Sequence, residues 1–172
     1  MSGTLTGRWF AALLVGYLAV ADWLFTTSGW GSLGAVAAEC GARAPDARFA
    51  PSPEETRAFI EGCRARGGVA AYQHLQLVDL VYPLLLAAVL ASVLGWLTRP
   101  WPRARWIVAL PVMAAAADYV ENAGAWILIS GATPTWTLYA VQLASLVKSV
   151  LTMVAVGAIV GFALRRHTRG RP

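Results

Sequence analysis

The chain has 172 residues, of which 58% are hydrophobic and 13% are charged, and its formal net charge is +5. A soluble domain is nearer one quarter charged, so the composition predicts an all-α integral membrane protein and argues against a water-soluble domain. The basic residues collect near the ends of apolar segments and form no groove interleaved with aromatic residues, so we expect no nucleic acid partner.

The first apolar segment covers residues 9–27 and is long enough to cross a bilayer about 30 Å thick. Asp22 is the one charge inside it. A cleaved signal peptide is the alternative, because Ala35-Val36-Ala37 resembles a cleavage site. The segment is longer than a usual signal core and carries an acid, so we expect a membrane span.

A polar segment, residues 28–74, follows this span and contains both cysteines. In an extracytoplasmic loop Cys40 and Cys63 predict a structural disulfide, because their spacing is not that of a CxxC redox pair. Two free thiols are the alternative. An N-capping serine followed by a proline and two acids predicts a short helix over residues 53–66.

Three further spans are expected at residues 75–97, 106–130 and 136–164, joined by short turns. The whole chain then forms a single domain, a four-helix transmembrane bundle. Pro83 is expected to kink the second span, since its ring removes the backbone hydrogen bond to residue 79.

The arginines predict the orientation of the bundle. Eight lie on the side that holds both termini, against five in the long loop. This bias and the disulfide-compatible loop predict a multi-pass protein of the cell membrane with both termini cytoplasmic. The lipid bilayer is the expected partner, and the sequence points to no particular protein partner.

Ionisable residues occur inside these apolar segments, where they are costly and often mark a functional site. The acids in the first three spans fall at similar depth in the outer half of the membrane, at about 1.5 Å per residue. Asp118, Glu121 and Asn122 share one helix face because they stand at i, i+3 and i+4. The full set of candidate ligand or proton-site residues is Asp22, Asp79, Tyr82, Asp118, Glu121, Asn122, Gln142 and Lys148.

The fourth span carries Lys148, the one lysine of the chain, on a stripe of polar residues that includes Gln142 and Ser145. Helical side chains lean toward the N-terminus of their own helix, which brings Lys148 and Asp118 together. Four acids exceed one lysine, so we expect a protonated carboxyl or a bound cation. The uncharged members, Asn122 among them, have an alternative role as interhelical hydrogen bonds worth about 0.6 kcal/mol each.

The pattern D-x-x-Y-P at residues 79–83, together with D-Y-x-E-N at 118–122, resembles a group of small bacterial four-span membrane proteins of unknown function. Four spans with embedded acids also resemble, in architecture alone, the emopamil-binding, sterol isomerase-like family. The resemblance implies the four-span fold and adds no particular chemistry.

Three functions fit these observations. The favoured one is an acidic pocket that binds or moves a cation, a proton or a small amine, since carboxylate and carboxamide oxygens suit hard cations. The second is a lipid- or isoprenoid-active enzyme that uses a protonated carboxyl as its acid. The third is a non-catalytic subunit of a larger membrane complex. The two histidines are expected on opposite sides of the membrane, so we predict no histidine-rich metal site, and nothing in the sequence indicates a cofactor.

Overall fold

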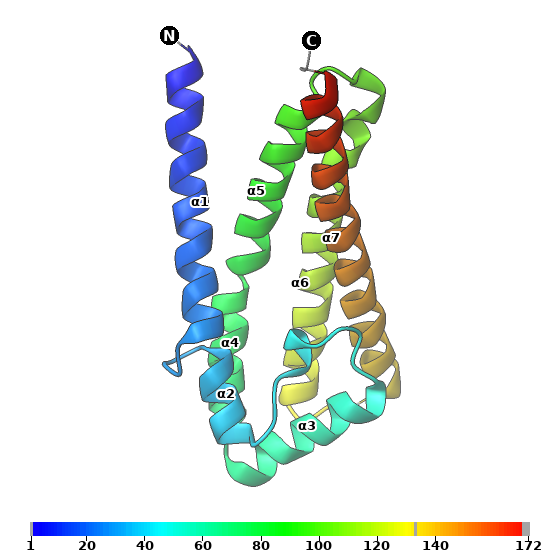
Figure 1. Cartoon of the computed structure of the whole chain (residues 1–172). Coiled ribbons are helices and arrows are strands. Elements are labelled where there is room, and N and C mark those ends of the chain that lie inside the picture. Colours follow the sequence, from blue (N-terminus) through cyan, green and yellow to red (C-terminus); the bar gives the residue numbers. More distant parts are fainter. Residues whose placement is uncertain (1, 133, 170–172) are drawn as a thin grey trace.

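The computed structural model describes residues 2–132 and 134–169, and all the regular structure in these residues is helical (Figure 1). In chain order the elements are α1 (Ser2–Thr26), α2 (Leu33–Cys40), the 3₁₀ turn η1 (Pro45–Ala47), α3 (Pro53–Arg66), α4 (Val69–Asp79), α5 (Tyr82–Leu97), the 3₁₀ helix η2 (Pro102–Val108), α6 (Ala109–Ile129) and α7 (Thr135–Arg169).

The long helices run along one axis, with α4 and α5 following one another as a single broken rod (Figure 1). α6 packs along α7, and α5 packs against α6, α7 and α1. The beginning of α1 and the end of α7 lie at the same end of the molecule, while α2 and α3 lie at the other end (Figure 1). The short helices therefore form a cap over one end of the long ones.

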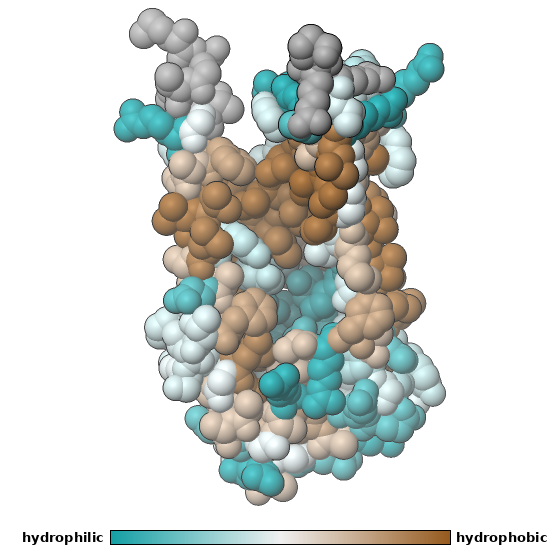
Figure 2. Space-filling view, viewed as in Figure 1, coloured by the Kyte–Doolittle hydropathy of each residue, from teal (hydrophilic) through white to brown (hydrophobic). Residues whose placement is uncertain are grey.

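Three segments are long and apolar enough to cross a membrane, and they are Gly7–Thr26, Val69–Leu97 and Thr135–Thr168. Figure 2 shows the corresponding hydrophobic band between two more hydrophilic ends. Helix α6 has 21 residues, which gives a length of about 31 Å at 1.5 Å per residue. It is not among the three, and the acids and the asparagine within it lower its mean hydropathy.

The boundaries of the expected spans shift. The segment expected at 75–97 already becomes helical at Val69, so the polar loop ends near residue 68 and not at 74. The 3₁₀ helix η2 occupies the start of the span expected at 106–130, and Pro111 in the first turn of α6 has no N–H to give to the carbonyl of Ile107 in η2. Helix α7 continues beyond residue 164 to Arg169.

The break between α4 and α5 confirms the kink expected at Pro83. Pro83 has no N–H to give to the carbonyl of Asp79, so the regular hydrogen bonding stops there. Tyr119 on α6 donates its hydroxyl to the nearby carbonyl of Leu80 at 2.6 Å. The break is thus stabilised from the neighbouring helix, and it leaves Asp79 as the last residue of α4.

The disulfide expected in the loop is present, with the Sγ atoms of Cys40 and Cys63 2.03 Å apart. It joins the end of α2 to α3. The loop is not a loose connection, because side chains of α2, α3 and α4 share one apolar core with the adjacent ends of α6 and α7. Val36, Phe59 and Leu128 are members of this core, each at most 5% exposed.

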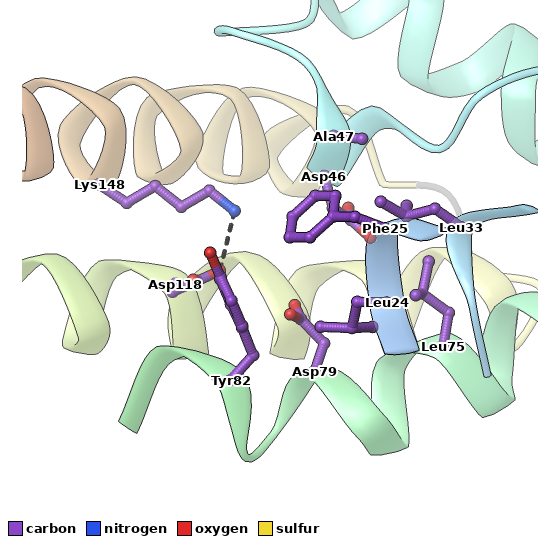
Figure 3. A pocket seen from close by; sticks show the side chains of 10 residues that line it. All are labelled: Leu24, Phe25, Leu33, Asp46, Ala47, Leu75, Asp79, Tyr82, Asp118 and Lys148. Atoms are coloured by element: carbon purple, nitrogen blue, oxygen red, sulfur yellow. Dashed lines mark hydrogen bonds and ion pairs between the residues drawn. The ribbon is translucent and has the colours of Figure 1, made fainter. Parts of the chain in front are cut away.

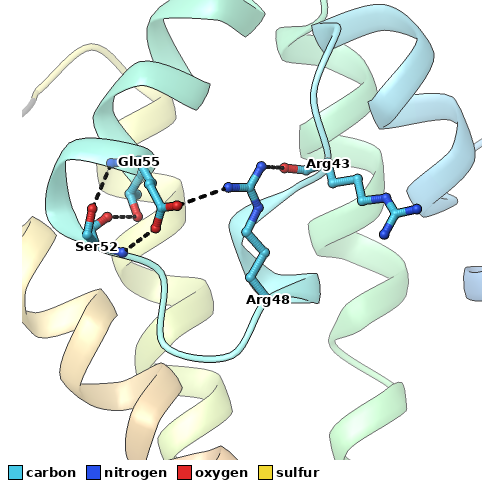
Figure 4. Close-up of polar contacts among 5 residues, drawn as sticks. Arg43, Arg48, Ser52 and Glu55 are labelled. Carbon is cyan, nitrogen blue, oxygen red and sulfur yellow. Dashed lines mark hydrogen bonds and ion pairs between the residues drawn. The ribbon is translucent and has the colours of Figure 1, made fainter.

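The helix expected over residues 53–66 is confirmed as α3, and its start has a capping box (Figure 4). The Glu55 N–H donates to the Ser52 hydroxyl at 3.1 Å, and the Ser52 N–H donates to the Glu55 carboxylate at 2.8 Å. Arg48 extends this network, since its guanidinium lies 3.6 Å from the Glu55 carboxylate and donates to the carbonyl of Arg43 at 3.2 Å (Figure 4). The segment that contains η1 is thereby tied to α3.

Candidate functional site

A cavity of about 60 Å³ lies between α1, α4, α5, α6 and α7, next to the loop that contains η1. Space of this size holds a few water molecules. The wall combines carboxyl groups and one ammonium with aliphatic and aromatic side chains (Figure 3). The residues that line it are Leu24, Phe25, Leu33, Asp46, Ala47, Leu75, Asp79, Tyr82, Asp118 and Lys148.

Lys148 is held by two carboxylates of α6. Its Nζ lies 2.9 Å from Asp118 Oδ1, which is the contact expected from the sequence, and 2.5 Å from Glu121 Oε2. The Glu121 side chain is fully buried and the Lys148 side chain is 16% exposed. Two carboxylates at this distance offset the desolvation cost of burying the ammonium. A single exposed carboxylate would not offset that cost.

Asp79 brings a further carboxyl from α4 into the cavity (Figure 3). Its position at the helix break lets the side chain turn toward α6 and α7. Asn122 is buried on the same face of α6, 1% exposed, and its two amide atoms have no hydrogen-bond partner among the described residues. The structure therefore gathers three more of the expected residues around Asp118 and Glu121, and these are Asp79, Asn122 and Lys148.

Asp46, in η1, is a cavity residue that the sequence did not single out. Tyr72 Oη donates to its Oδ1 at 3.0 Å, and Gln76 Nε2 donates to its Oδ2 at 2.6 Å. Burial raises the pKa of the Asp46 carboxyl, while the Lys148 ammonium and the Tyr72 hydroxyl act in the opposite direction. The sequence held one indication of such a residue, namely Gln76, which lies on the same helix face as Asp79. A buried glutamine amide needs a hydrogen-bond partner, and Asp46 is that partner.

Four of the eight expected site residues do not line the cavity. Glu121 and Asn122 follow Asp118 on α6, where Glu121 contacts Lys148, whereas Asp22 and Gln142 lie apart from the site. Asp22 is exposed and accepts a hydrogen bond from the hydroxyl of Thr26 at 2.8 Å. The cavity is lined instead by Leu24, which is about 200° farther around α1 at 100° per residue. The height of Asp22 along α1 was the basis of its expected place in the site, but height does not determine on which side of the helix the side chain lies. Gln142 is half-buried on α7 and is not part of the wall.

The site has more acceptors than donors. Within residues 2–132 and 134–169, the acceptors Glu121 Oε1, Gln76 Oε1 and Asn122 Oδ1 are buried without a hydrogen-bond partner, against one unpartnered donor of the site, Asn122 Nδ2. A buried oxygen of this kind normally has a donor, from protein, water or ligand. The surplus of acceptors therefore favours either a proton on one carboxyl or a donor-bearing guest.

A second cavity, of about 30 Å³, lies against the same ion pair. Asp118 and Lys148 line both cavities, so the pair separates them. The other walls of the second cavity are almost entirely apolar and come from α5, α6 and α7. Ala114 and Ala115 of α6 line this small space.

In the part of the chain that the structure describes, no group of three His, Cys, Asp or Glu side chains is placed to hold a metal ion. The carboxyls of Asp46, Asp79 and Asp118 come from three different elements and surround the cavity without meeting at one point.

Comparisons of the chain with protein-family models, with curated proteins and with solved structures find no match. The site is therefore interpreted from its own chemistry.

Proposed function

We propose that this chain is an integral membrane protein in which α6 crosses the bilayer as a fourth span beside the three apolar segments. The polar residues of α6 face α5 and α7 and not lipid, which supports a span of low mean hydropathy. Both ends of the described chain lie at one end of the molecule (Figure 1), and the disulfide lies at the other. This supports cytoplasmic termini and an extracytoplasmic cap.

The function that the geometry supports best is the binding or movement of a small cation, proton or amine in the cavity under the cap. The observation that carries this proposal is the charge of the wall. Three carboxyls line the cavity, a fourth at Glu121 adjoins it, and Lys148 is the one cation among the lining residues. Uncompensated charge in a low-dielectric interior is costly, so protons or a cation must balance the excess.

Lys148 provides a way to admit a cation. Because it contacts both Asp118 and Glu121, it can leave the Asp118 carboxylate and keep a buried counter-charge in Glu121. Asp118 and Asp79 then face an entering cation from two sides of the cavity. The exchange replaces one favourable contact with another, which keeps its energetic cost low.

The test measures cation binding and proton release together. Purified protein in weakly buffered detergent solution is titrated with sodium, potassium and methylammonium chloride. Wild-type protein is expected to bind at least one of them with release of protons, and Asp79→Asn and Asp118→Asn should each weaken that binding at least tenfold. Asp22→Asn is the matched control, an acid outside the cavity, and should bind as wild type does. Equal binding by all four proteins, or none by wild type, contradicts the proposal.

A second candidate is a lipid-active enzyme in which a protonated Asp79 or Asp118 donates to an isoprenoid or acyl-lipid group. It is favoured by the hollow in Figure 2, whose hydrophilic interior opens beside the hydrophobic band. A lipidomic comparison of cells with and without the gene tests it, and an unchanged set of lipid classes contradicts it.

A further inference from the structure

We infer that the cation taken by this cavity is organic, an alkylammonium whose apolar part packs on the aromatic and aliphatic wall, and that it enters from the outer leaflet. This inference rests on the proposed cation-binding function and specifies its ligand class. It follows from the composition of the wall, the spacing of the carboxyls and the position of the opening.

The wall is only partly made of oxygen donors. Phe25 and Tyr82 line it with their rings in edge contact, 5.8 Å between centroids. Aromatic faces attract organic ammonium groups. Leu24 and Leu75, each 2% exposed, add aliphatic surface that has no affinity for a bare metal ion. An ammonium with an alkyl substituent can use both kinds of wall.

The carboxyls are spaced for a guest larger than an atomic ion. Asp46 comes from the loop, Asp79 from the helix break and Asp118 from α6. Calcium needs six to eight oxygens at about 2.3–2.6 Å, which requires the donors to converge. In the described residues they do not converge. An ammonium needs only one or two carboxylates near its N–H groups and tolerates apolar neighbours elsewhere.

The cavity is covered toward the cap and open toward the side. On the cap side, η1 contributes Asp46 and Ala47 to the wall, and Tyr72 and Gln76 hold Asp46 in place. Phe25 lines the cavity and is still 57% exposed, so it stands at the mouth. Figure 2 shows the hollow between the α1 side and the α7 side, at the edge of the hydrophobic band. An amphiphile that partitions into the outer leaflet reaches this mouth directly.

The experiment uses full-length protein in phosphatidylcholine nanodiscs and measures its thermal unfolding temperature at constant ionic strength. The probes are butylammonium, potassium as an inorganic cation and butanol as the neutral counterpart of the amine. Butylammonium is expected to raise the unfolding temperature with a saturable dependence on concentration. Potassium and butanol at the same concentrations should not.

Two matched variants locate the effect. Phe25→Leu is expected to weaken butylammonium binding about two- to fivefold, as loss of a cation–π contact does, and its exposure makes folding tolerant of the change. Phe49→Leu alters a phenylalanine that is 63% exposed outside the cavity and should bind as wild type does.

Each contrary outcome has a distinct meaning. An equal effect of potassium and butylammonium overturns the organic-cation inference and leaves the proposed cation site in place. Equal binding by wild type, Phe25→Leu and Phe49→Leu overturns the role of the aromatic mouth and with it the inference. No response to either cation overturns both proposals.

Discussion

Gln76 Nε2 lies 2.6 Å from Asp46 Oδ2, so the amide of α4 binds the carboxylate of a loop residue 30 positions earlier in the chain. Tyr72, one turn before Gln76, donates to the other oxygen. These two donors place a loop acid in the wall of a cavity that is made mostly by helices. The cap is therefore part of the site and not only a covering over it.

Removal of either donor should loosen this attachment. Gln76→Leu leaves one Asp46 oxygen without its amide donor, which typically costs about 1–3 kcal/mol for a buried group. Tyr72→Phe removes the other donor with almost no change of shape. Gln73→Leu, a half-buried glutamine on the same helix, is the control. The free energy of unfolding in detergent measures the effect, and losses no larger than that of Gln73→Leu would disprove the role of these contacts.

The raised pKa of Asp46 predicts a pH dependence of stability. The folded protein holds a proton on Asp46 at pH values where the unfolded chain, with an ordinary Asp pKa of about 3.9, has lost it. The stabilising contribution of this proton to the free energy of unfolding is therefore fully present below the ordinary Asp pKa. It is lost as the pH rises through the raised pKa of Asp46 in the folded protein.

Thermal unfolding of wild type and Asp46→Asn, measured from pH 4 upward, checks this sign. The stability difference between wild type and Asp46→Asn should shift with increasing pH against wild type. Glu61→Gln, at an exposed acid of α3, should follow the wild-type profile. A wild-type protein that gains stability relative to Asp46→Asn as the pH rises would contradict the prediction.

Lys148→Met should be strongly destabilising. It leaves Asp118 and Glu121 without their shared cation, and loss of one partner from a buried ion pair costs about 3–5 kcal/mol. Addition of Asp118→Asn and Glu121→Gln to this variant should recover part of the loss, because neutral amides need no counter-charge. Denaturant titration in detergent compares the three proteins, and a triple variant less stable than Lys148→Met would be inconsistent with this explanation.

The close packing of α6 on α7 gives a prediction that is independent of charge. A Cβ at Gly124 would overlap the side chain of Val141, which is 2% exposed and has little room to move. Gly124→Ala is expected to cost about 1–3 kcal/mol, as overpacking does.

Gly157→Ala on α7 is the matched control, since a Cβ there meets nothing within 4 Å. It should be neutral or slightly stabilising, because alanine favours helix over glycine by about 1 kcal/mol. Equal unfolding temperatures for Gly124→Ala and Gly157→Ala would show that α6 and α7 are not packed as described.

The features predicted from the sequence alone depend on local rules. Helical period places Asp118 and Glu121 on one face, and the lean of helical side chains predicts the contact between Asp118 and Lys148 that the structure contains. Capping chemistry predicts α3, and the lack of an N–H in Pro83 predicts the break before α5. Each of these depends on residues within one or two turns, or on the height of a residue along a helix.

Tertiary structure decided which way each face points and where the loop runs. Height along α1 placed Asp22 with the other acids, but the rotation of α1 against α5 turns it outward and brings Leu24 to the cavity. Asp46 stands in a 3₁₀ turn of three residues, which is too short to have a period that indicates the direction of a side chain, and contacts with Tyr72 and Gln76 on α4 bring it in. Helix rotation and loop path depend on packing between segments far apart in the chain, and local periodicity carries no information about that packing.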